Sequence, residues 1–431
     1  MNILILTNTF TPHVGGVARS VEAFVAEYRK RGHRVLVVAP EFPEMAQDEN
    51  DVVRINAIQN FNASDFSVAL PIHPHLSSAV DDFKPDIVHS QHPFLLGLTA
   101  LRLARHRGLP LVFTHHTLYE QYTHYVPGNS PALKRFVIEL ATCYAKLCDQ
   151  VFAPSESIRD LLQQRGVTAP ITVVPTGVHL DAFASGDGAA FRRQLDIPQD
   201  AFVVGHLGRL APEKNLAFLA QAVADFVSHQ PAAHFLVVGT GPSTEAIREI
   251  FAQADLAQRL HFAGILQQQE LSDALHAMDL FAFASTSETQ GMVLTEAMAA
   301  GLPVVALDAP GVREVVRDKD NGRLLHDTSI AAFSAALQWM FERSPQQRDA
   351  LQQSALATAC DFSMPRSADT ALACYASRIE QLRLEVAAAA DTDENNLDEI
   401  LSYIKTEWDI FKSYARAGDC AIDANLFSEK D

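Results

Sequence analysis

Residues 287–305 read SETQGMVLTEAMAAGLPVV and carry two carboxylates, Glu288 and Glu296, on either side of Gly291. The apolar run DLFAFAS precedes the stretch, so the predicted order is a strand, a turn and a helix that begins near Met292. The first turn of a helix presents free N–H groups with a partial positive charge, and carboxylates accept hydrogen bonds from paired hydroxyls. The stretch therefore indicates a turn that binds phosphate or sugar oxygens. A solvated loop acid and a carboxylate favoured by the helix dipole are the simpler alternatives.

Short apolar runs alternate with helical patterns along the whole chain. The expected strands are 2–7, 34–40, 86–91, 111–116, 150–155 and 171–177, and then 201–208, 234–241, 259–264, 279–285 and 302–308. Continuous apolar strands separated by helices are typical of parallel sheets with both faces covered. We therefore predict an α/β protein with two doubly wound, Rossmann-like domains that face a central cleft, with ligands at the carboxyl ends of the strands.

Breaks in this pattern predict the domain boundaries. Residues 1–185 form a first domain, 186–365 a second, 366–385 a helix that crosses back, and 386–431 an acidic linker with an amphipathic helical tail. The tail helix, at 397–415, spaces its apolar residues four and three apart, which places them on one face. That face either packs back on the body or contacts a partner or a membrane. Its residues are Leu397, Leu401, Ile404, Trp408 and Phe411.

Composition narrows the class of protein. A net charge of −18 over 431 residues argues against a nucleic-acid binder, which presents basic stripes to phosphate. The first 185 residues hold 15 Lys and Arg against 17 Asp and Glu, so this half tolerates an anionic surface. Five cysteines without metal-site spacing predict reduced thiols. With no recognisable signal peptide or membrane span, we expect a cytoplasmic protein, either soluble or peripheral on the inner membrane face.

A basic pair follows the strand that opens the second half. In HLGRLAPEKN (206–215) the strand ends at Gly208, and Arg209 and Lys214 come before the next helix. A guanidinium fork, an ammonium group and the amides of a helix start together suit a diphosphate. Two solvated charges at a helix start are the alternative interpretation.

Two loops of the first half are also candidate binding segments. PHVGGV (12–17) places Gly15 and Gly16 between a strand and a helix, either as a plain turn or as amides that reach an anion. FTHHTLYEQYTHYVPG (113–128) closes a strand, and its histidines fit no HExxH-like metal spacing. We interpret it as a sugar- or acceptor-binding loop. The helical stretch 131–146, with basic residues beside apolar ones, either covers the sheet or lies in a bilayer interface.

Two D-x-D triplets, DKD (318–320) and DTD (391–393), have the pattern of some metal sites. One lies in a charged turn before Asn-Gly and the other in the tail, so we interpret both as solvated charges.

Several of these motifs together resemble glycosyltransferase family 4, which has the GT-B fold. HLGRLAPEKN, GTGP (239–242), FAGIL (262–266) and SETQGMVLTEAMAAGLPVVA carry the resemblance, and PHVGGV and VVPTGVHLDAF (173–183) agree in place and order. The resemblance covers about residues 1–384. It implies that Glu288 contacts the donor sugar, Glu296 the nucleotide ribose, and the basic pair the diphosphate. The other donor-site residues implied are Gly15, Gly16, Gly208, Gly239, Gly241, Ile265, Leu266, Gln290, Gly291, Met292 and Val293.

The loop THHTLYEQYTHYVP resembles the branch of the family that glycosylates diacylglycerol at a membrane face. The resemblance places His116 near the anomeric carbon, beside the catalytic residues Glu288, Arg209 and Lys214. It implies a retaining hexosyltransferase that takes a UDP-sugar, UDP-glucose above all, and needs no metal or cofactor. Another acceptor (a phosphoinositol lipid, a polysaccharide or a small metabolite) or a non-catalytic nucleotide-sugar-binding module are the alternatives. The implied acceptor residues are His115, Tyr119, Tyr122, His124 and Tyr125.

Overall fold

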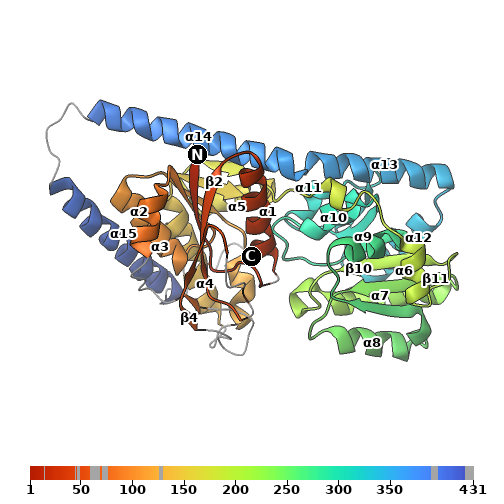
Figure 1. Ribbon diagram of the computed structural model, residues 1–431. Helices are drawn as coiled ribbons and strands as arrows, with labels where there is room; N and C mark the ends of the chain where they lie inside the picture. Colours follow the sequence, from red (N-terminus) through yellow and green to blue (C-terminus); the bar gives the residue numbers. More distant parts are fainter. Residues whose placement is uncertain are drawn as a thin grey trace. The chain divides into compact units, whose positions relative to one another are not determined.

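The computed structural model describes residues 1–13, 15–43, 45, 49–58, 68–69, 76–125, 130–389 and 397–422. The chain forms two compact units. The first comprises Met1–Thr176 and Ser367–Asp431, and the second comprises Gly177–Arg366. Each unit contains a parallel sheet covered by helices (Figure 1). The α/β class and the pair of Rossmann-like domains predicted from the sequence are therefore confirmed.

The main sheet of the first unit has seven parallel strands in the order β3-β2-β1-β6-β7-β8-β9. The order reverses between β1 and β6, so the carboxyl ends of these strands flank the switch point at which such sheets bind ligands. A short antiparallel pair, β4 and β5, forms a separate sheet. The strands are β1 (Asn2–Leu6), β2 (Arg34–Pro40), β3 (Val52–Ile55), β4 (Ala57–Ile58), β5 (Val68–Ala69), β6 (Ile87–Ser90), β7 (Leu111–Thr114), β8 (Gln150–Ala153) and β9 (Ile171–Val173).

Helices cover this sheet on both faces. One buried apolar cluster joins Leu4 and Leu6 of β1 to helices α2, α3, α4 and α5, whereas Tyr28 of α1 and Tyr375 of α14 meet at His89 of β6. The helices of the first unit are α1 (Gly16–Lys30), α2 (Leu76–Phe83), α3 (Leu96–Arg107), the 3-10 helix η2 (Tyr119–Tyr125), α4 (Pro131–Lys146), α5 (Glu156–Gln164), α14 (Met364–Ala389, from Ser367 on) and α15 (Leu397–Ile422).

The second sheet has six parallel strands in the order β12-β11-β10-β13-β14-β15. Val203 and Phe281 belong to one apolar cluster, and their neighbours Val204 and Leu280 belong to another. Successive side chains point to opposite faces of a sheet, so both faces are buried, as continuous apolar strands predict. The strands are β10 (Phe202–Leu207), β11 (Ala233–Val238), β12 (Leu260–Gly264), β13 (Leu280–Phe283), β14 (Val304–Leu307) and β15 (Gly322–Leu325).

The helices of the second unit fill the connections between these strands. They are η3 (Leu180–Ala182), α6 (Gly188–Gln194), η4 (Pro212–Lys214), α7 (Leu216–His229), α8 (Thr244–Gln253), η5 (Ala257–Arg259), α9 (Gln268–His276), α10 (Met292–Ala299), α11 (Val312–Val315), α12 (Ile330–Phe341) and α13 (Pro345–Asp361).

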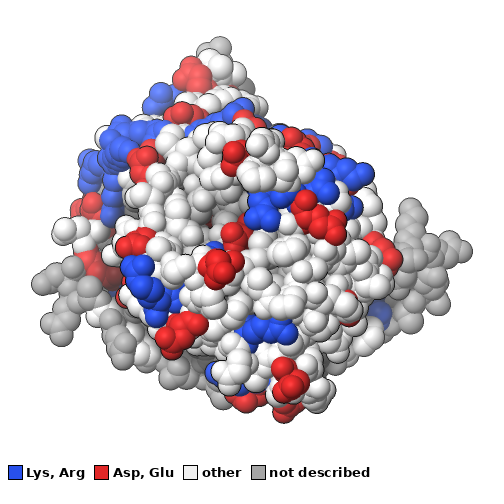
Figure 2. All heavy atoms as spheres, turned by 90° about the vertical axis from the view of Figure 1, so that its right-hand side faces the viewer, with Lys and Arg blue, Asp and Glu red and all other residues white. Residues whose placement is uncertain are grey.

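On the face shown in Figure 2, basic and acidic side chains are interspersed, and the described residues of that face form no continuous basic patch of the kind that binds nucleic acid.

The division between the units falls after Thr176, whereas the sequence pattern places it at residue 185. Val178 explains the difference. Its N–H donates to Phe362 O at 2.8 Å, and its carbonyl accepts from the N–H of Met364 at 2.9 Å. Residues that follow Thr176 are thereby tied to the end of the second unit.

The tail helix α15 packs against α4 and α3 of the first unit, which is one of the two predicted alternatives (Figure 1). The buried face, however, is not the predicted one. Ile404, Trp408 and Phe411 are 58%, 57% and 60% exposed, while the side chains of Leu397 and Leu401 lie outside the described residues. The residues buried against the unit are Thr406, Ile410 and Ala417. Among the described residues, none of the helices is both long enough and apolar enough to cross a bilayer.

Candidate active site

Loops at the carboxyl edge of the second sheet carry the predicted donor-binding residues. They follow four neighbouring strands, so one edge of the sheet brings together segments that are far apart in the sequence. The segments are 208–214 after β10, 239–241 after β11, 264–266 after β12 and 284–291 after β13.

Two of the predicted glycines hold these loops against each other. A Cβ on Gly239 would lie 1.9 Å from Gly208 O, and a Cβ on Gly241 would lie 2.3 Å from Leu210 O. The Gly239 N–H also donates to Gly264 O at 2.7 Å. These glycines are therefore required for the close approach of backbones, whatever ligand the loops bind.

Lys214 and Glu288 form a hydrogen-bonded ion pair across 74 positions of sequence. The ammonium side chain is 21% exposed and the carboxylate side chain 15% exposed. The motifs predict the lysine to be a diphosphate ligand and the glutamate a sugar ligand, and the structure places the two residues in direct contact. A ligand group that contacts Lys214 therefore also lies close to Glu288.

Arg209 is paired with Glu213, a residue that the sequence analysis did not single out. The Arg209 guanidinium lies 2.7 Å from a Glu213 carboxylate oxygen, and Glu213 is 6% exposed at its side chain. Burial raises the pKa of Glu213, but the backbone amide of the residue itself, Arg209 and Lys214 outweigh burial and lower the pKa overall. Glu213 also ties the two loops together, since its carbonyl accepts from Ser285 and Ser287 at 3.4 and 3.3 Å. The pairing of Glu213 with Arg209 could have been predicted from their spacing, since the two residues lie four positions apart.

The turn that opens α10 has the conformation predicted for it. Gly291 adopts φ +76°, and α10 begins at Met292. Glu296 lies one turn inside the helix and is buried, as is Gln290. Gly311 packs against this turn, because a Cβ there would lie 2.6 Å from the Gln290 nitrogen. Of the remaining predicted donor residues, Val293 and Leu266 are half-buried, while Ile265 is exposed.

His206 is a second residue at this edge that the motifs did not identify. Its Nδ1 donates to Ala282 O at 3.1 Å, and its ring stacks on Phe281 and Phe283. Burial lowers its pKa to about 4; the hydrogen bond to Ala282 and the charge of Glu288 oppose this shift, and the charge of Lys214 adds to it. Within the described residues, its buried Nε2 has no hydrogen-bond partner. The neutral ring therefore offers a hydrogen-bond acceptor near Gly208, at the start of the loop predicted to bind a diphosphate.

The glycine loop of the first unit differs from those of the second. Gly15 caps α1 in an extended conformation, φ −162°, and Gly16 is the first helical residue. A Cβ on Gly15 would lie 3.0 Å from His13 Nε2, whereas a Cβ on Gly16 would meet no atom of the described residues within 4 Å. The backbone at Gly16 is thus open to approach by a ligand.

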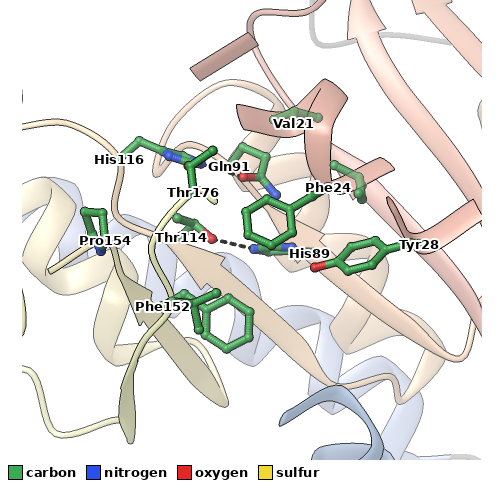
Figure 3. Close-up of a pocket in the computed structure, with 12 residues that line it drawn as sticks. Val21, Phe24, Tyr28, His89, Gln91, Thr114, His116, Phe152, Pro154 and Thr176 are labelled. Atoms are coloured by element: carbon green, nitrogen blue, oxygen red, sulfur yellow. Dashed lines mark hydrogen bonds between the residues drawn. The ribbon is translucent and has the colours of Figure 1, made fainter. Parts of the chain in front are cut away.

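His116 follows β7 and lines a pocket of the first unit (Figure 3). Its Nε2 lies 2.6 Å from Gln91 Oε1, so the ring donates to the amide oxygen. Burial lowers the pKa of His116 to about 4, and the ring is therefore uncharged at neutral pH. Gln91 was not predicted as a site residue from the sequence, although it directly follows the end of β6. The other pocket residues include Ile5, Val21, Phe24, Thr114, Phe152 and Thr176.

A buried chain of polar groups, which includes pocket-lining residues, joins four elements, α1, β6, β7 and α14. His89 Nε2 lies 2.7 Å from Thr114 Oγ1, and its Nδ1 lies 2.6 Å from the hydroxyl of Tyr375. The Tyr375 hydroxyl also lies 3.2 Å from that of Tyr28. Burial, followed by the charge of His116, lowers the pKa of His89 to about 3. Figure 3 shows Tyr28, His89 and Thr114 side by side among the residues that line the pocket.

The structure describes the side chains of two predicted acceptor residues, His115 and Tyr119, and neither is among the residues that line the pocket of His116. His115 is fully buried between Phe113 and Tyr119, with edge-to-face ring contacts of 5.9 and 5.6 Å. Within the described residues, neither ring nitrogen of His115 nor the Tyr119 hydroxyl has a hydrogen-bond partner. Tyr122, His124 and Tyr125 belong to η2, but their side chains lie outside the described residues.

The first D-x-D triplet forms surface contacts. Asp318 lies 2.7 Å from Arg323, and Asp320 accepts from Ser354 at 3.0 Å. The second triplet, at 391–393, lies outside the described residues.

The chain matches known proteins over most of its length. The family model described as Glycosyltransferase Family 4 matches residues 14–182, and the one described as Glycosyl transferases group 1 matches residues 187–357. The alpha-monoglucosyldiacylglycerol synthase of Streptococcus pneumoniae is 30% identical over 346 residues, which is 78% of each chain. The GDP-mannose-dependent alpha-mannosyltransferase of Mycobacterium tuberculosis is 29% identical over 75% of this chain and 84% of its own.

A solved structure agrees with this assignment at the level of the fold. The structure of Anabaena HepE in complex with UDP has a TM-score of 0.69 at 23% identity, and the match covers 88% of this chain and 100% of that one. The chain therefore belongs to glycosyltransferase family 4 and is a glycosyltransferase with the GT-B fold.

Proposed function

We propose that the protein transfers a hexose from a UDP-sugar, UDP-glucose above all, to the hydroxyl of diacylglycerol at the cytoplasmic face of a membrane. The observation that carries the proposal is the contact between Lys214 and Glu288, next to Arg209 and the start of α10. One sheet edge thus offers two cations and helix amides for a diphosphate, and a carboxylate for sugar hydroxyls.

The names of related proteins support the choice of substrates. The Streptococcus pneumoniae relative makes alpha-monoglucosyldiacylglycerol by its name, and the HepE structure holds UDP. The mannosyltransferase relative favours a second candidate, in which GDP-mannose is the donor.

In the proposed reaction, the bond between C1 of the sugar and the β-phosphate oxygen breaks, and its electron pair leaves with UDP. Arg209 and Lys214 stabilise the charge that develops on the diphosphate. The acceptor hydroxyl attacks C1 from the face that UDP leaves, and its proton passes to a phosphate oxygen of UDP. The anomeric configuration is thereby retained without a protein nucleophile or a metal ion. His116, uncharged near neutral pH, is the expected neighbour of the anomeric carbon.

The direct test is a transfer assay with purified protein and diacylglycerol-containing vesicles. Labelled UDP-glucose, UDP-galactose, UDP-glucuronic acid, UDP-sulfoquinovose and GDP-mannose are supplied separately, and the lipid is extracted and counted. We expect label in the lipid phase from UDP-glucose. Glu288→Ala should abolish it, whereas Glu245→Ala, an exposed change on α8 in the same unit, should not.

Each other result points to a different alternative. Lipid label from GDP-mannose alone would replace the donor, and label released only as free sugar would move the acceptor to another lipid, a polysaccharide or a small metabolite. Tight nucleotide binding without turnover on any acceptor would indicate a non-catalytic binding module.

A further inference from the structure

We propose that the exposed face of α15, formed by Ile404, Trp408, Phe411 and the half-exposed Tyr414, seats the first unit in the interface of a lipid bilayer. The inference rests on the proposed lipid acceptor, because an enzyme that glycosylates a bilayer lipid must approach the membrane surface. We call these four residues the outer face of α15.

The outer face is unusual for the surface of a folded unit. Ile404, Trp408 and Phe411 are 58%, 57% and 60% exposed. The rings of Trp408 and Phe411 stack with their centroids 5.6 Å apart, which makes one continuous apolar patch. Contiguous apolar patches bordered by polar residues mark contact sites with proteins, membranes or ligands.

The exposure follows from how the helix is fixed. On one side, Arg102 of α3 binds Glu407 through two hydrogen bonds of 2.5 and 3.1 Å. On the other, Arg416 pairs with Glu139 of α4 at 2.6 Å. Arg135 of α4 donates to the carbonyl of Cys420 at 3.1 Å and to that of Ala421 at 2.9 Å. Rotation of α15 that buried Trp408 would break these contacts on both sides, so the outer face stays outward.

The size of the patch argues against a second copy of the chain as the occupant. With exposed fractions of 38–60% and side chains of about 150–250 Å² each, the four residues offer roughly 400 Å². A stable protein interface takes about 800 Å² from each partner. A bilayer makes no such demand, because each inserted side chain contributes by itself.

The chemistry of the patch fits a bilayer interface. Tryptophan and other aromatic residues favour the boundary between headgroups and acyl chains. Lys405 and Lys412, both exposed, border the patch and can extend their ammonium groups toward the headgroups. Lys412 is paired with Asp409 at 2.9 Å, and the chain carries a net charge of −18. The recognition is therefore apolar, and it needs no anionic lipid.

The position of α15 also agrees with the proposed reaction. Helix α4 contacts both α15 and η2, and η2 belongs to the predicted acceptor loop. A bilayer that receives the outer face of α15 therefore meets the same structural module that carries the acceptor loop.

Vesicle flotation with the full chain and no donor tests the inference. The vesicles contain phosphatidylcholine and diacylglycerol, and a second set adds phosphatidylglycerol. We expect the protein to float with the neutral vesicles in low and high salt, and to bind the anionic set no better. The double change Trp408→Ser and Phe411→Ser should lower the partition coefficient by on the order of tenfold for each side chain lost. Ile330→Ser, which removes an exposed apolar residue of the second unit, should leave it unchanged.

A spectroscopic readout gives the depth of contact. The chain has two tryptophans, so Trp339→Phe leaves Trp408 as the only reporter. Its emission should shift to the blue and be quenched by brominated lipid when vesicles are added. An unchanged emission, flotation that the double change does not affect, or a sedimentation coefficient that falls on that change in the absence of vesicles would each overturn the inference.

Transfer to a short-chain diacylglycerol dissolved as monomers separates this inference from the proposed function. Normal transfer to the monomeric lipid without vesicle binding would overturn the inference alone. Vesicle binding through the outer face without transfer to any diacylglycerol would overturn the proposed acceptor alone.

Discussion

At the scale of single residues, two ion pairs lie at the carboxyl edge of the second sheet, where the donor is predicted to bind. Lys214 contacts Glu288, and Arg209 contacts Glu213. Each cation is oriented by a carboxylate before any ligand arrives, so little side-chain freedom is lost on binding. The same pairing means that removing one member leaves its partner without its main counter-charge.

We expect Lys214→Ala to raise the KM for the donor and to lower kcat, because in the proposed reaction the lysine both binds the diphosphate and stabilises its charge as the bond breaks. The loss in kcat/KM should be about 10²–10³-fold, comparable to removal of one oxyanion donor. Steady-state transfer kinetics and calorimetric titration with UDP measure the two effects. Arg193→Ala, an exposed change on α6, is the control. Unchanged kinetics in Lys214→Ala would make the ion pair purely structural.

The glycines of the two units should respond differently to alanine. Gly239→Ala places a Cβ 1.9 Å from Gly208 O, and we expect a loss of about 2 kcal/mol or more in the free energy of unfolding. Gly16→Ala meets no described atom within 4 Å and lies in a helix, so stability should be kept or slightly increased. If Gly16 approaches the donor, transfer should nevertheless fall. Urea unfolding measures the stability of both variants, and transfer assays measure their activity. Full activity of Gly16→Ala would show that the glycine loop is not part of the site.

At the scale of elements, α14 is attached to the first unit by a buried polar contact. The Tyr375 hydroxyl reaches His89 of β6 and Tyr28 of α1, and His89 and Tyr28 line the same pocket as His116. Because α14 begins in the second unit and continues in the first, this contact fixes the part of the helix that returns.

Tyr375→Phe tests that attachment. The change removes a hydroxyl with two buried partners, and we expect a loss of about 1–3 kcal/mol in the free energy of unfolding. Binding of UDP, whose predicted ligands are mostly in the second unit, should not change by more than about twofold if the units are independent in this respect. Urea unfolding followed by circular dichroism and calorimetric UDP binding provide the two measurements. A large loss of UDP affinity would show that α14 couples the units.

At the scale of the whole molecule, pH dependence follows from four buried histidines of the first unit, which are uncharged at neutral pH. Burial lowers the pKa of His89, His92 and His115 to about 3 and that of His116 to about 4. Above pH 6.5 neither the folded nor the unfolded chain binds these protons. As the pH falls below 6.5, the unfolded chain takes them up first, so the free energy of unfolding decreases down to the folded pKa values.

Acid should therefore destabilise the protein well above the pH at which carboxylates titrate. Between pH 7 and pH 5 we expect a loss of about 2 kcal/mol for each such histidine. His89→Gln should be less stable than the natural chain at pH 7 but show a shallower dependence on pH. Tyr375→Phe removes a hydrogen bond from His89 and keeps the imidazole, so it should retain the steep dependence. Equal slopes for the two variants in urea titrations would contradict this origin of the acid sensitivity.

Local patterns were enough to predict much of this molecule. Continuous apolar strands between helices predict two parallel sheets, because a strand buried on both faces has no polar alternation. The turn at Gly291 and the helix that begins at Met292 follow from chain-local preferences. Glu288 and Lys214 were both singled out from their motifs. Their contact was not, since it joins residues 74 positions apart at the ends of two neighbouring strands.

Which side of each element faces the interior could not be predicted from the sequence, because it depends on contacts between distant segments. Periodicity shows that Ile404, Trp408 and Phe411 share a face of α15, but the helix is held by Arg102, Arg135 and Arg416 contacts that periodicity does not register. In the same way, Gln91 becomes the hydrogen-bond partner of His116 because the strands that precede these two residues, β6 and β7, pair with each other. The fold and the chemical groups at the carboxyl edge of the second sheet could be predicted from the sequence, because both depend on local order along the chain. Partner choice and exposure depend on long-range packing, and only the folded structure determines them.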